Sequence, residues 1–252
     1  MKNNTLFLLT IVMVLSVASC KKKVETCKLG KAYISDGNTT PNANTFSYYS
    51  DGKLQKVVYA DKTKDSVAYS ADTIYIRTYD VNDSVISLFA GVLNSNGDVV
   101  SGVKDYLNYS GSITSTDIYS LEYNAEGKLT KKTITNSLQS TLLNLNYDGG
   151  NTATGNLFIG GVLDRSYTFY HNTIENKTGV DDMNAVFTPY FGRPSQNLLD
   201  SMRIVTAADD TIRVQYSHTL DANEYVSKTT QTFLTTNADT RYSTYQYFGC
   251  SK

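Results

Sequence analysis

The sequence is poor in the residues that build most catalytic and metal sites. It contains two histidines, His171 and His218, three cysteines and no tryptophan among 252 residues. It has no Cys-x-x-Cys or His-x-His pair, no Gly-x-Ser-x-Gly turn and no glycine-rich phosphate loop. The tight group Asp80, Asn82 and Asp83 falls short of the roughly six to eight oxygens that calcium takes. We therefore expect no catalytic site, no bound metal and no cofactor.

A long apolar segment is also missing. The longest apolar run, residues 6–17, follows a positive start and is shorter than the roughly 20 residues of a membrane-spanning helix. This layout is typical of a secretory signal. The run leads into the letters LSVASC, which end at Cys20 and resemble the lipobox of bacterial lipoproteins.

The lipobox resemblance implies how the chain is processed. In that family the signal is cut before the cysteine, which is then acylated at its sulfur and its new amino group. The resemblance therefore implies a signal peptide over residues 1–19, a tether over residues 20–26 with palmitate or a similar chain on Cys20, and a folded domain over residues 27–252. More than one acyl chain anchors a protein stably where a single chain does not. The alternative is an ordinary signal peptide with an incidental cysteine.

Three lysines, residues 21–23, follow Cys20 directly. They either attract anionic lipid, by about 1 kcal/mol each, or form a solvated tether. Lipoproteins of the Bacteroidetes type that reach the cell surface tend to carry an acidic patch at this place, and here Glu25 is the one nearby acidic residue. This departure favours an outer-membrane location that faces the periplasm.

The charge of the remaining chain excludes one class of partner. Setting aside Lys2 and residues 21–23 from the 23 basic residues leaves 19, against 24 acidic residues. A mildly acidic body binds nucleic acid poorly, because attraction to phosphate requires a basic face. We expect no nucleic-acid partner.

Two cysteines remain once Cys20 carries lipid. Cys27 lies near the start of the folded domain and Cys250 near its end, and an oxidising envelope compartment makes them candidates for one disulfide. The alternative is two independent thiols. A disulfide would require the first and last strands to lie side by side, because bridged Cα atoms sit within about 7 Å of each other.

Residues 27–252 are expected to form one β domain. Twenty tyrosines, nine phenylalanines and only three prolines suit pleated sheets. Apolar and polar residues alternate in residues 211–218, 117–123 and 73–79, as in antiparallel strands that water reaches on one side. About 230 residues fit a single β domain.

Short phrases around glycine recur along the chain. They place Asp51-Gly52, Asn96-Gly97, Glu126-Gly127 and Gly149-Gly150 between alternating runs, with Tyr48, Tyr123 and Tyr147 just before three of these turns. Each phrase predicts a hairpin turn at which the chain takes a positive φ. The glycines recur at irregular intervals, which argues against a regular repeat array. The glycine phrases therefore indicate turns between strands and do not point to a catalytic or binding site.

One segment departs from the alternation. Ser195 can cap a short helix near residues 195–202, because Leu198, Leu199 and Met202 would then share one face. The hairpin phrases, the letters YFGRPSQNLL and the lipobox together resemble a family of uncharacterised Bacteroidetes lipoproteins with a porin-like or strongly curved β-meander fold. We expect an all-β, single-domain antiparallel meander, a strongly curved sheet or partly closed barrel, with this one short helix. The resemblance carries no catalytic residues.

A second short pattern joins Asp to Ser or Thr and then to a β-branched residue or methionine. It resembles the O-glycosylation acceptor of Bacteroidetes envelope proteins, and the acceptors would be Ser66, Thr73, Ser84, Ser201 and Thr211. The alternative is that Asp ends a turn and the next residues open a strand. Ser66 and Ser84 are the favoured acceptors.

Three function classes follow. The leading hypothesis is a non-catalytic binding or scaffolding module of the envelope that holds a glycan or protein on a tyrosine-rich sheet face, because tyrosine is enriched at recognition surfaces. The alternative is a periplasmic carrier of lipid or another apolar ligand inside a curved sheet. An enzyme is the least favoured class, because no acid, base and nucleophile constellation is visible.

Overall fold

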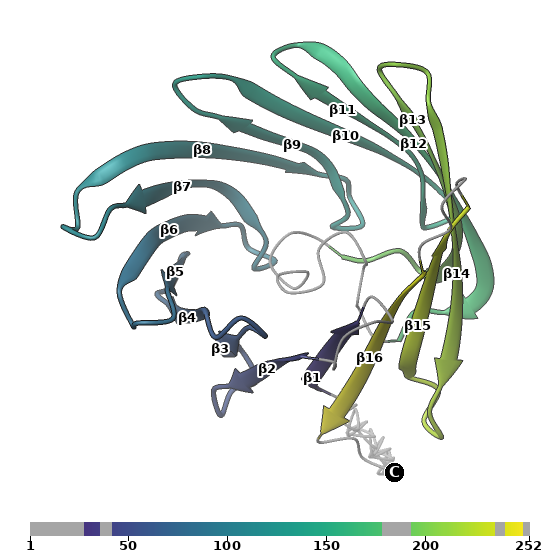
Figure 1. Ribbon diagram of the computed structural model, residues 1–252, viewed down its shortest axis with the longest axis horizontal. Coiled ribbons are helices and arrows are strands. Elements are labelled where there is room, and N and C mark those ends of the chain that lie inside the picture. Colours follow the sequence, from purple (N-terminus) through teal and green to yellow (C-terminus); the bar gives the residue numbers. More distant parts are fainter. Residues whose placement is uncertain (1–27, 36–41, 178–192, 235–239, 249–252) are drawn as a thin grey trace, which may run out of the picture.

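The protein forms a closed barrel of antiparallel strands (Figure 1). The computed structural model describes residues 28–35, 42–177, 193–234 and 240–248. All regular structure in these ranges is β, and no helix there could cross a membrane. The sixteen strands are β1 (Lys28–Ser35), β2 (Asn42–Tyr48), β3 (Leu54–Val58), β4 (Lys64–Tyr69), β5 (Thr73–Tyr79), β6 (Val85–Leu93), β7 (Val99–Leu107), β8 (Ile113–Tyr123), β9 (Leu129–Thr135), β10 (Ser140–Asp148), β11 (Asn151–Ile159), β12 (Val162–Glu175), β13 (Asn197–Thr206), β14 (Thr211–Leu220), β15 (Val226–Phe233) and β16 (Thr240–Phe248).

Each strand pairs with its neighbours in the chain, and β1 pairs with β16 to close the sheet. The register of that last pair sets Lys28 opposite Phe248. The prediction of an all-β antiparallel meander is confirmed, and the sheet closes fully. The first and last strands lie side by side, which is the condition that a bond between Cys27 and Cys250 requires. Both cysteines lie outside the described residues.

The short helix expected near residues 195–202 does not form, and that prediction was wrong. Strand β13 begins at Asn197 and takes up the rest of the segment, between β12 and β14. The hydroxyl of Ser195 lies 3.0 Å from that of Thr152 and accepts the main-chain N–H of Thr152 at 3.1 Å, so it does not cap a helix. Leu198 is 3% exposed and faces the core. Strand pairing outweighs the weak local preference for a helical turn.

Apolar side chains that point inward form the core of the barrel. In β4 and β5 the inward positions Val67 and Ile74 are completely buried, while the outward positions Ser66 and Tyr75 are exposed. The buried members of this core are Ala32, Phe46, Leu54, Val57, Val67, Ile74, Ile76, Phe89, Val99, Leu121, Leu129, Leu198, Val226 and Tyr245. Strand β14 is outwardly polar, as expected, with Arg213 and Gln215 exposed on either side of the buried Val214.

The glycine phrases form hairpin turns, as predicted. Gly52, Gly97 and Gly127 have φ values of 91°, 87° and 76°, in the left-handed region that glycine adopts without a Cβ clash. In the third turn the side-chain oxygen of Asn124 accepts the main-chain N–H groups of Glu126 and Lys128 at 3.0 and 2.9 Å. Such local hydrogen bonds replace the ladder bonds that the chain loses where it reverses.

The tyrosines beside these turns tie neighbouring strands together. Three of them, together with Tyr69 at the end of β4, lie at or one residue before the end of a strand and donate their hydroxyl groups to a main-chain carbonyl at the start of the preceding strand. The pairs are Tyr48 with Leu29, Tyr69 with Leu54, Tyr123 with Val99 and Tyr147 with Leu129, at 2.9, 2.9, 2.6 and 2.8 Å. All four pairs lie at the end of the barrel where β1 begins and β16 ends, because the strands alternate in direction.

Candidate functional site

The residues singled out in the sequence do not converge on one site. Cys20, Cys27 and Cys250 lie outside the described residues. The five glycosylation candidates are spread over three regions of the barrel: Ser66, Thr73 and Ser84 on or beside β4–β6, Ser201 on β13 and Thr211 at the start of β14. Ser66 and Thr211 are exposed, and the other three are half-buried.

The carboxylate of Asp80 is hydrogen-bonded within its own turn. The Asp80 carboxylate accepts the main-chain N–H groups of Asn82 and Ser84 at 2.9 and 2.8 Å. Asp83 contacts Lys64. Among the described residues no cluster of three or more histidine, cysteine, aspartate or glutamate side chains could hold a metal ion.

His218 has a partner at each ring nitrogen. Nε2 lies 2.7 Å from the carbonyl of Leu199, which can only accept, so Nε2 carries the proton and donates. Nδ1 lies within hydrogen-bond distance of the Thr229 hydroxyl, at 3.0 Å. Thr229 is 3% exposed. These contacts are those of a histidine that joins strands β13, β14 and β15.

Several titratable side chains point into the barrel. The Tyr59 hydroxyl donates to Asp65 at 2.6 Å, and burial followed by this bond raises the pKa of Tyr59. Tyr106 donates to Asp117 at 3.0 Å, and burial, then the same kind of bond, raises its pKa to about 12. Burial lowers the pKa of the Lys132 ammonium group. The two tyrosines therefore keep their protons at neutral pH and serve as hydrogen-bond donors.

Two hollows open on the outer wall of the barrel. The first, the β4–β7 hollow, has a volume of about 600 Å³ and is lined by Ser66, Ala68, Tyr75, Ile76, Arg77, Leu88, Phe89, Ala90, Val103 and Asp105. Strand register arranges its outward side chains in two cross-strand rows. One row runs from Ser66 through Arg77 and Leu88 to Asp105. The other contains Tyr75 and Val103, which are 45% and 41% exposed.

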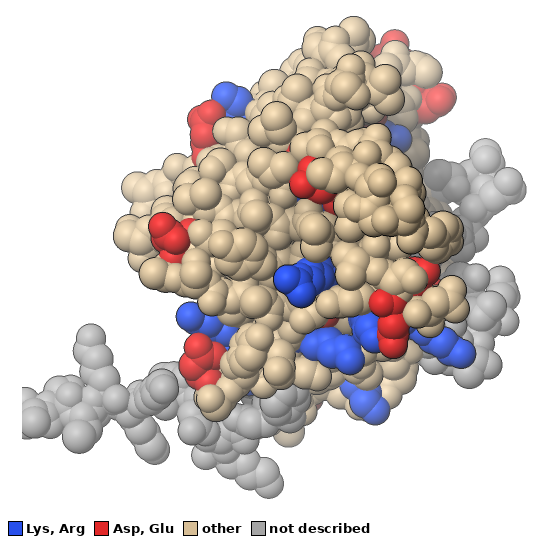
Figure 2. Space-filling view, turned by 90° about the vertical axis from the view of Figure 1, so that its left-hand side faces the viewer, with Lys and Arg blue, Asp and Glu red and all other residues tan. Residues whose placement is uncertain are grey.

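The side of the barrel that carries β5–β8 shows few charged residues over most of its surface. Strands β5–β8 curve along the left-hand side of Figure 1, and Figure 2 looks onto that side. Uncharged residues cover most of it, while Lys and Arg gather toward its lower edge. This surface suits a ligand without a strong net charge.

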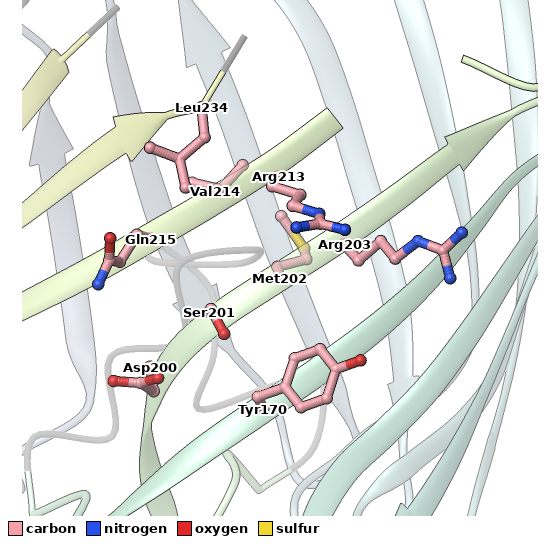
Figure 3. A pocket seen from close by; sticks show the side chains of 9 residues that line it. All are labelled: Tyr170, Asp200, Ser201, Met202, Arg203, Arg213, Val214, Gln215 and Leu234. Carbon is pink, nitrogen blue, oxygen red and sulfur yellow. The ribbon is translucent and has the colours of Figure 1, made fainter. Parts of the chain in front are cut away.

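The second hollow, the β12–β14 hollow, has a volume of about 480 Å³ (Figure 3). Its lining residues are Tyr170, Asp200, Ser201, Met202, Arg203, Arg213, Val214, Gln215 and Leu234. Register again sets the outward side chains in rows. Tyr170 lies opposite Ser201, and Ser201 lies opposite Gln215. In the neighbouring row Arg203 lies directly opposite Arg213.

The two hollows share a set of chemical groups. Each combines an exposed tyrosine ring, at least one arginine, an aspartate and a serine. A flat ring supplies contact area at low entropic cost, and the polar groups donate and accept hydrogen bonds around it. Such a surface can hold a ligand rich in hydroxyl groups. The sequence alternation identified Arg213 and Gln215 only as polar positions, and Tyr75, Tyr170 and Arg203 were missed as site residues.

Comparison with known proteins bears on the fold. No family model and no curated protein matches the sequence. A porin-like protein from Bacteroides uniformis matches with a TM-score of 0.65 and 16% identity, over 87% of this chain and 97% of that one. A porin-like protein from Bacteroides vulgatus matches with a TM-score of 0.62 and 14% identity, over 88% of this chain and 98% of that one. The fold is therefore a porin-like β-barrel similar to those of these Bacteroides proteins.

Proposed function

We propose that this protein is a non-catalytic binding module of the bacterial cell envelope, anchored by lipid at Cys20, that holds glycans on the outer wall of its barrel. The observation that carries the proposal is the pair of tyrosine-centred polar hollows on that wall. Their volumes lie within the roughly 300–1,000 Å³ of small-ligand sites. A hollow of this kind suits a sugar chain better than a flat protein interface.

The outer wall also argues for binding rather than for a pore. Strand β14 presents Thr211, Arg213, Gln215 and Ser217 outward, all of them exposed. A barrel that spans a membrane presents a continuous apolar band to lipid. The polar outward face of β14 would interrupt such a band, which suits a barrel held beside the membrane by its lipid.

The proposed anchor sets the distance of the barrel from the membrane. Strand β1 begins at Lys28, eight residues after Cys20 in the sequence. A fully extended chain of that length reaches at most about 29 Å. The anchored barrel would therefore stay close to the periplasm-facing leaflet of the outer membrane, the location that residues 21–23 favour.

The packing of the core favours surface binding over carriage of an apolar ligand inside the barrel. Inward side chains such as Val57, Val67, Ile74, Val99 and Val214 are at most 1% exposed. These groups pack against protein atoms, whereas the two hollows open outward.

A glycan array tests the proposal. The mature lipoprotein, purified in detergent, is compared with the Tyr75→Ala and Tyr170→Ala variants. A matched control is Tyr109→Ala, since Tyr109 is 89% exposed and lies in the β7–β8 turn, outside both hollows. We expect glycan binding that falls about tenfold or more in at least one hollow variant and is unchanged in the control.

Two outcomes would overturn the proposal. One is the absence of any bound glycan from the array. The other is glycan binding that neither hollow variant reduces. Capture of an envelope protein that depends on Tyr75 or Tyr170, without glycan binding, would assign the hollows to a protein ligand instead.

A further inference from the structure

We infer that the β12–β14 hollow binds an anionic saccharide, one with a carboxylate or sulfate group, and that Arg203 and Arg213 hold that group. The inference rests on the proposed glycan-binding function and names the class of glycan for one of the two hollows.

The two arginines form an uncompensated pair of like charges. Arg203 lies directly opposite Arg213 across strands β13 and β14, and both side chains are exposed on the outer wall. Like charges in directly opposed positions destabilise a sheet. Other residues could stand at these two outward positions without that repulsion. An anion bound between the two guanidinium groups would remove the repulsion.

Six other cations among the described residues have acidic partners, whereas others, such as Lys31, Lys56 and Arg77, form no ion pair there. The six ion pairs among the described residues use Lys53, Lys64, Lys128, Lys131, Arg165 and Lys177. Within the same part of the chain, neither Arg203 nor Arg213 has an ion-pair partner or a side-chain hydrogen bond. The two guanidinium groups are therefore available to a ligand.

The chemistry of arginine narrows the ligand. A guanidinium group is a planar fork of donors that matches a carboxylate or sulfate with two parallel hydrogen bonds. The Cβ atoms of directly opposed residues lie about 4.5–5.5 Å apart. In Figure 3 the Arg203 guanidinium points away from that of Arg213, and rotation of these exposed side chains brings both forks to one anionic group.

The rest of the hollow sets the orientation of the sugar. Figure 3 shows Asp200 and Gln215 at the end of the hollow away from the two guanidinium groups. The ring of Tyr170 lies along one side of the hollow, between the two ends. The Asp200 carboxylate repels an anionic group and accepts hydrogen bonds from hydroxyls, and Gln215 can donate and accept. The anionic group therefore lies at the arginine end, and neutral hydroxyl groups lie at the Asp200 end.

The β4–β7 hollow provides an internal contrast. It contains one arginine, Arg77, whose cross-strand neighbours are the uncharged Ser66 and Leu88, and the same row ends in Asp105. One positive and one negative charge balance in that hollow. It therefore has no reason to select an anionic sugar.

Three probes of one backbone test the inference: dextran, carboxymethyl dextran and dextran sulfate of matched length. Binding to the mature lipoprotein in detergent is measured at low and high salt. We expect at least one anionic dextran to bind about tenfold or more tightly than dextran at low salt, and this preference to shrink as salt screens the charges. Comparison of the two anionic probes shows whether the carboxylate or the sulfate is preferred.

The variants separate a specific site from general electrostatics. The double variant Arg203→Gln with Arg213→Gln should lose the preference for anionic dextran, and the Arg203→Lys, Arg213→Lys double should retain part of it. The control Lys31→Gln with Lys56→Gln removes the same charge from β1 and β3, outside both hollows, and should keep the preference. Thermal unfolding of each variant checks that it is folded.

The outcomes distinguish the two proposals. Glycan binding without any anionic preference, or a preference that the lysine control loses equally, overturns this inference and leaves the proposed function standing. Failure of the wild-type protein to bind the dextrans or any glycan on the array overturns both.

Discussion

The hydroxyl group of Tyr147 donates a hydrogen bond to the main-chain carbonyl of Leu129 at 2.8 Å, and the ammonium group of Lys128 lies 5.5 Å from the centre of the same ring. Tyr69 repeats this arrangement with Leu54 at 2.9 Å and Lys53 at 5.1 Å. The recurring sequence Gly-Lys-Leu, at residues 52–54 and 127–129, therefore joins neighbouring strands. The leucine starts one strand, the lysine directly precedes it, and both contact the tyrosine near the end of the next strand.

Replacing Tyr147 by phenylalanine should destabilise the barrel modestly. The substitution keeps the ring and its contact with Lys128 but leaves the Leu129 carbonyl without the phenolic donor. A lost hydrogen bond of this kind costs about 1 kcal/mol of unfolding free energy. Urea denaturation should show a lower midpoint with an unchanged slope.

The control for that change is Tyr109→Phe. Tyr109 is 89% exposed and has no such partner among the described residues, so its substitution should leave the midpoint unchanged. An equal loss of stability in the two variants would show that the Tyr147 bond contributes nothing specific.

Gly91 and Gly102 lie opposite each other on β6 and β7, and the ring of Phe89 packs across them. A Cβ atom added at Gly91 would lie 2.7 Å from a ring carbon of Phe89. We predict that Gly91→Ala destabilises the protein by about 1–3 kcal/mol, the usual cost of overpacking. Chemical denaturation measures this change.

A second substitution tests the cause of that loss. In the Gly91→Ala background, Phe89→Leu removes the ring, and the double variant should be destabilised by less than the sum of the two single substitutions. Strictly additive destabilisation by the two substitutions would exclude a clash between the new methyl group and the ring.

Local features of the sequence predicted the strands and turns correctly, because alternation and glycine turns depend on neighbours in the chain. The segment that begins at Ser195 was read wrongly because its partner, Thr152, is 43 residues away. The β12–β14 hollow depends on register across three strands. The sequence held one signal for this hollow. The hairpin turn that includes Asp209 and Asp210 joins β13 to β14 and so brings Arg203 opposite Arg213. The fold was therefore largely readable from the sequence, whereas the hollows required the barrel.

Stability should fall in strong alkali. Burial, together with the hydrogen bonds to Asp65 and Asp117, raises the pKa of Tyr59 and that of Tyr106, the latter to about 12. An unfolded tyrosine has a pKa of about 10. Because the folded state favours the neutral phenol, the stability from these residues is fully present below about pH 10 and is lost as the pH rises through the folded pKa.

Urea denaturation over a range of alkaline pH, with phenolate absorbance recorded in parallel, measures this loss. The Tyr106→Phe variant should show a shallower fall, because one of the raised groups is gone. Ionisation of all tyrosines of the folded protein near pH 10, without loss of stability, would contradict the prediction.

Cys27 and Cys250 should form a disulfide in protein from an oxidising compartment. The adjacent strands β1 and β16 set Lys28 opposite Phe248, close in sequence to the two cysteines. A loop of this length restricts the unfolded chain by about 5 kcal/mol on the entropic account. Reduction should therefore lower the thermal midpoint of the wild type and leave that of a Cys27→Ser, Cys250→Ser variant unchanged. Two thiols that react freely in denatured, unreduced protein would contradict the bond.

Oxidative side-chain footprinting of the mature lipoprotein, with and without its preferred anionic dextran, is the most direct test of binding on the outer wall. Tyr170 and Tyr109 are 52% and 89% exposed, so both report on their surroundings. The account predicts that the ligand protects Tyr170 from oxidation and leaves Tyr109 unchanged. Ligand binding with Tyr170 as reactive as before would contradict it.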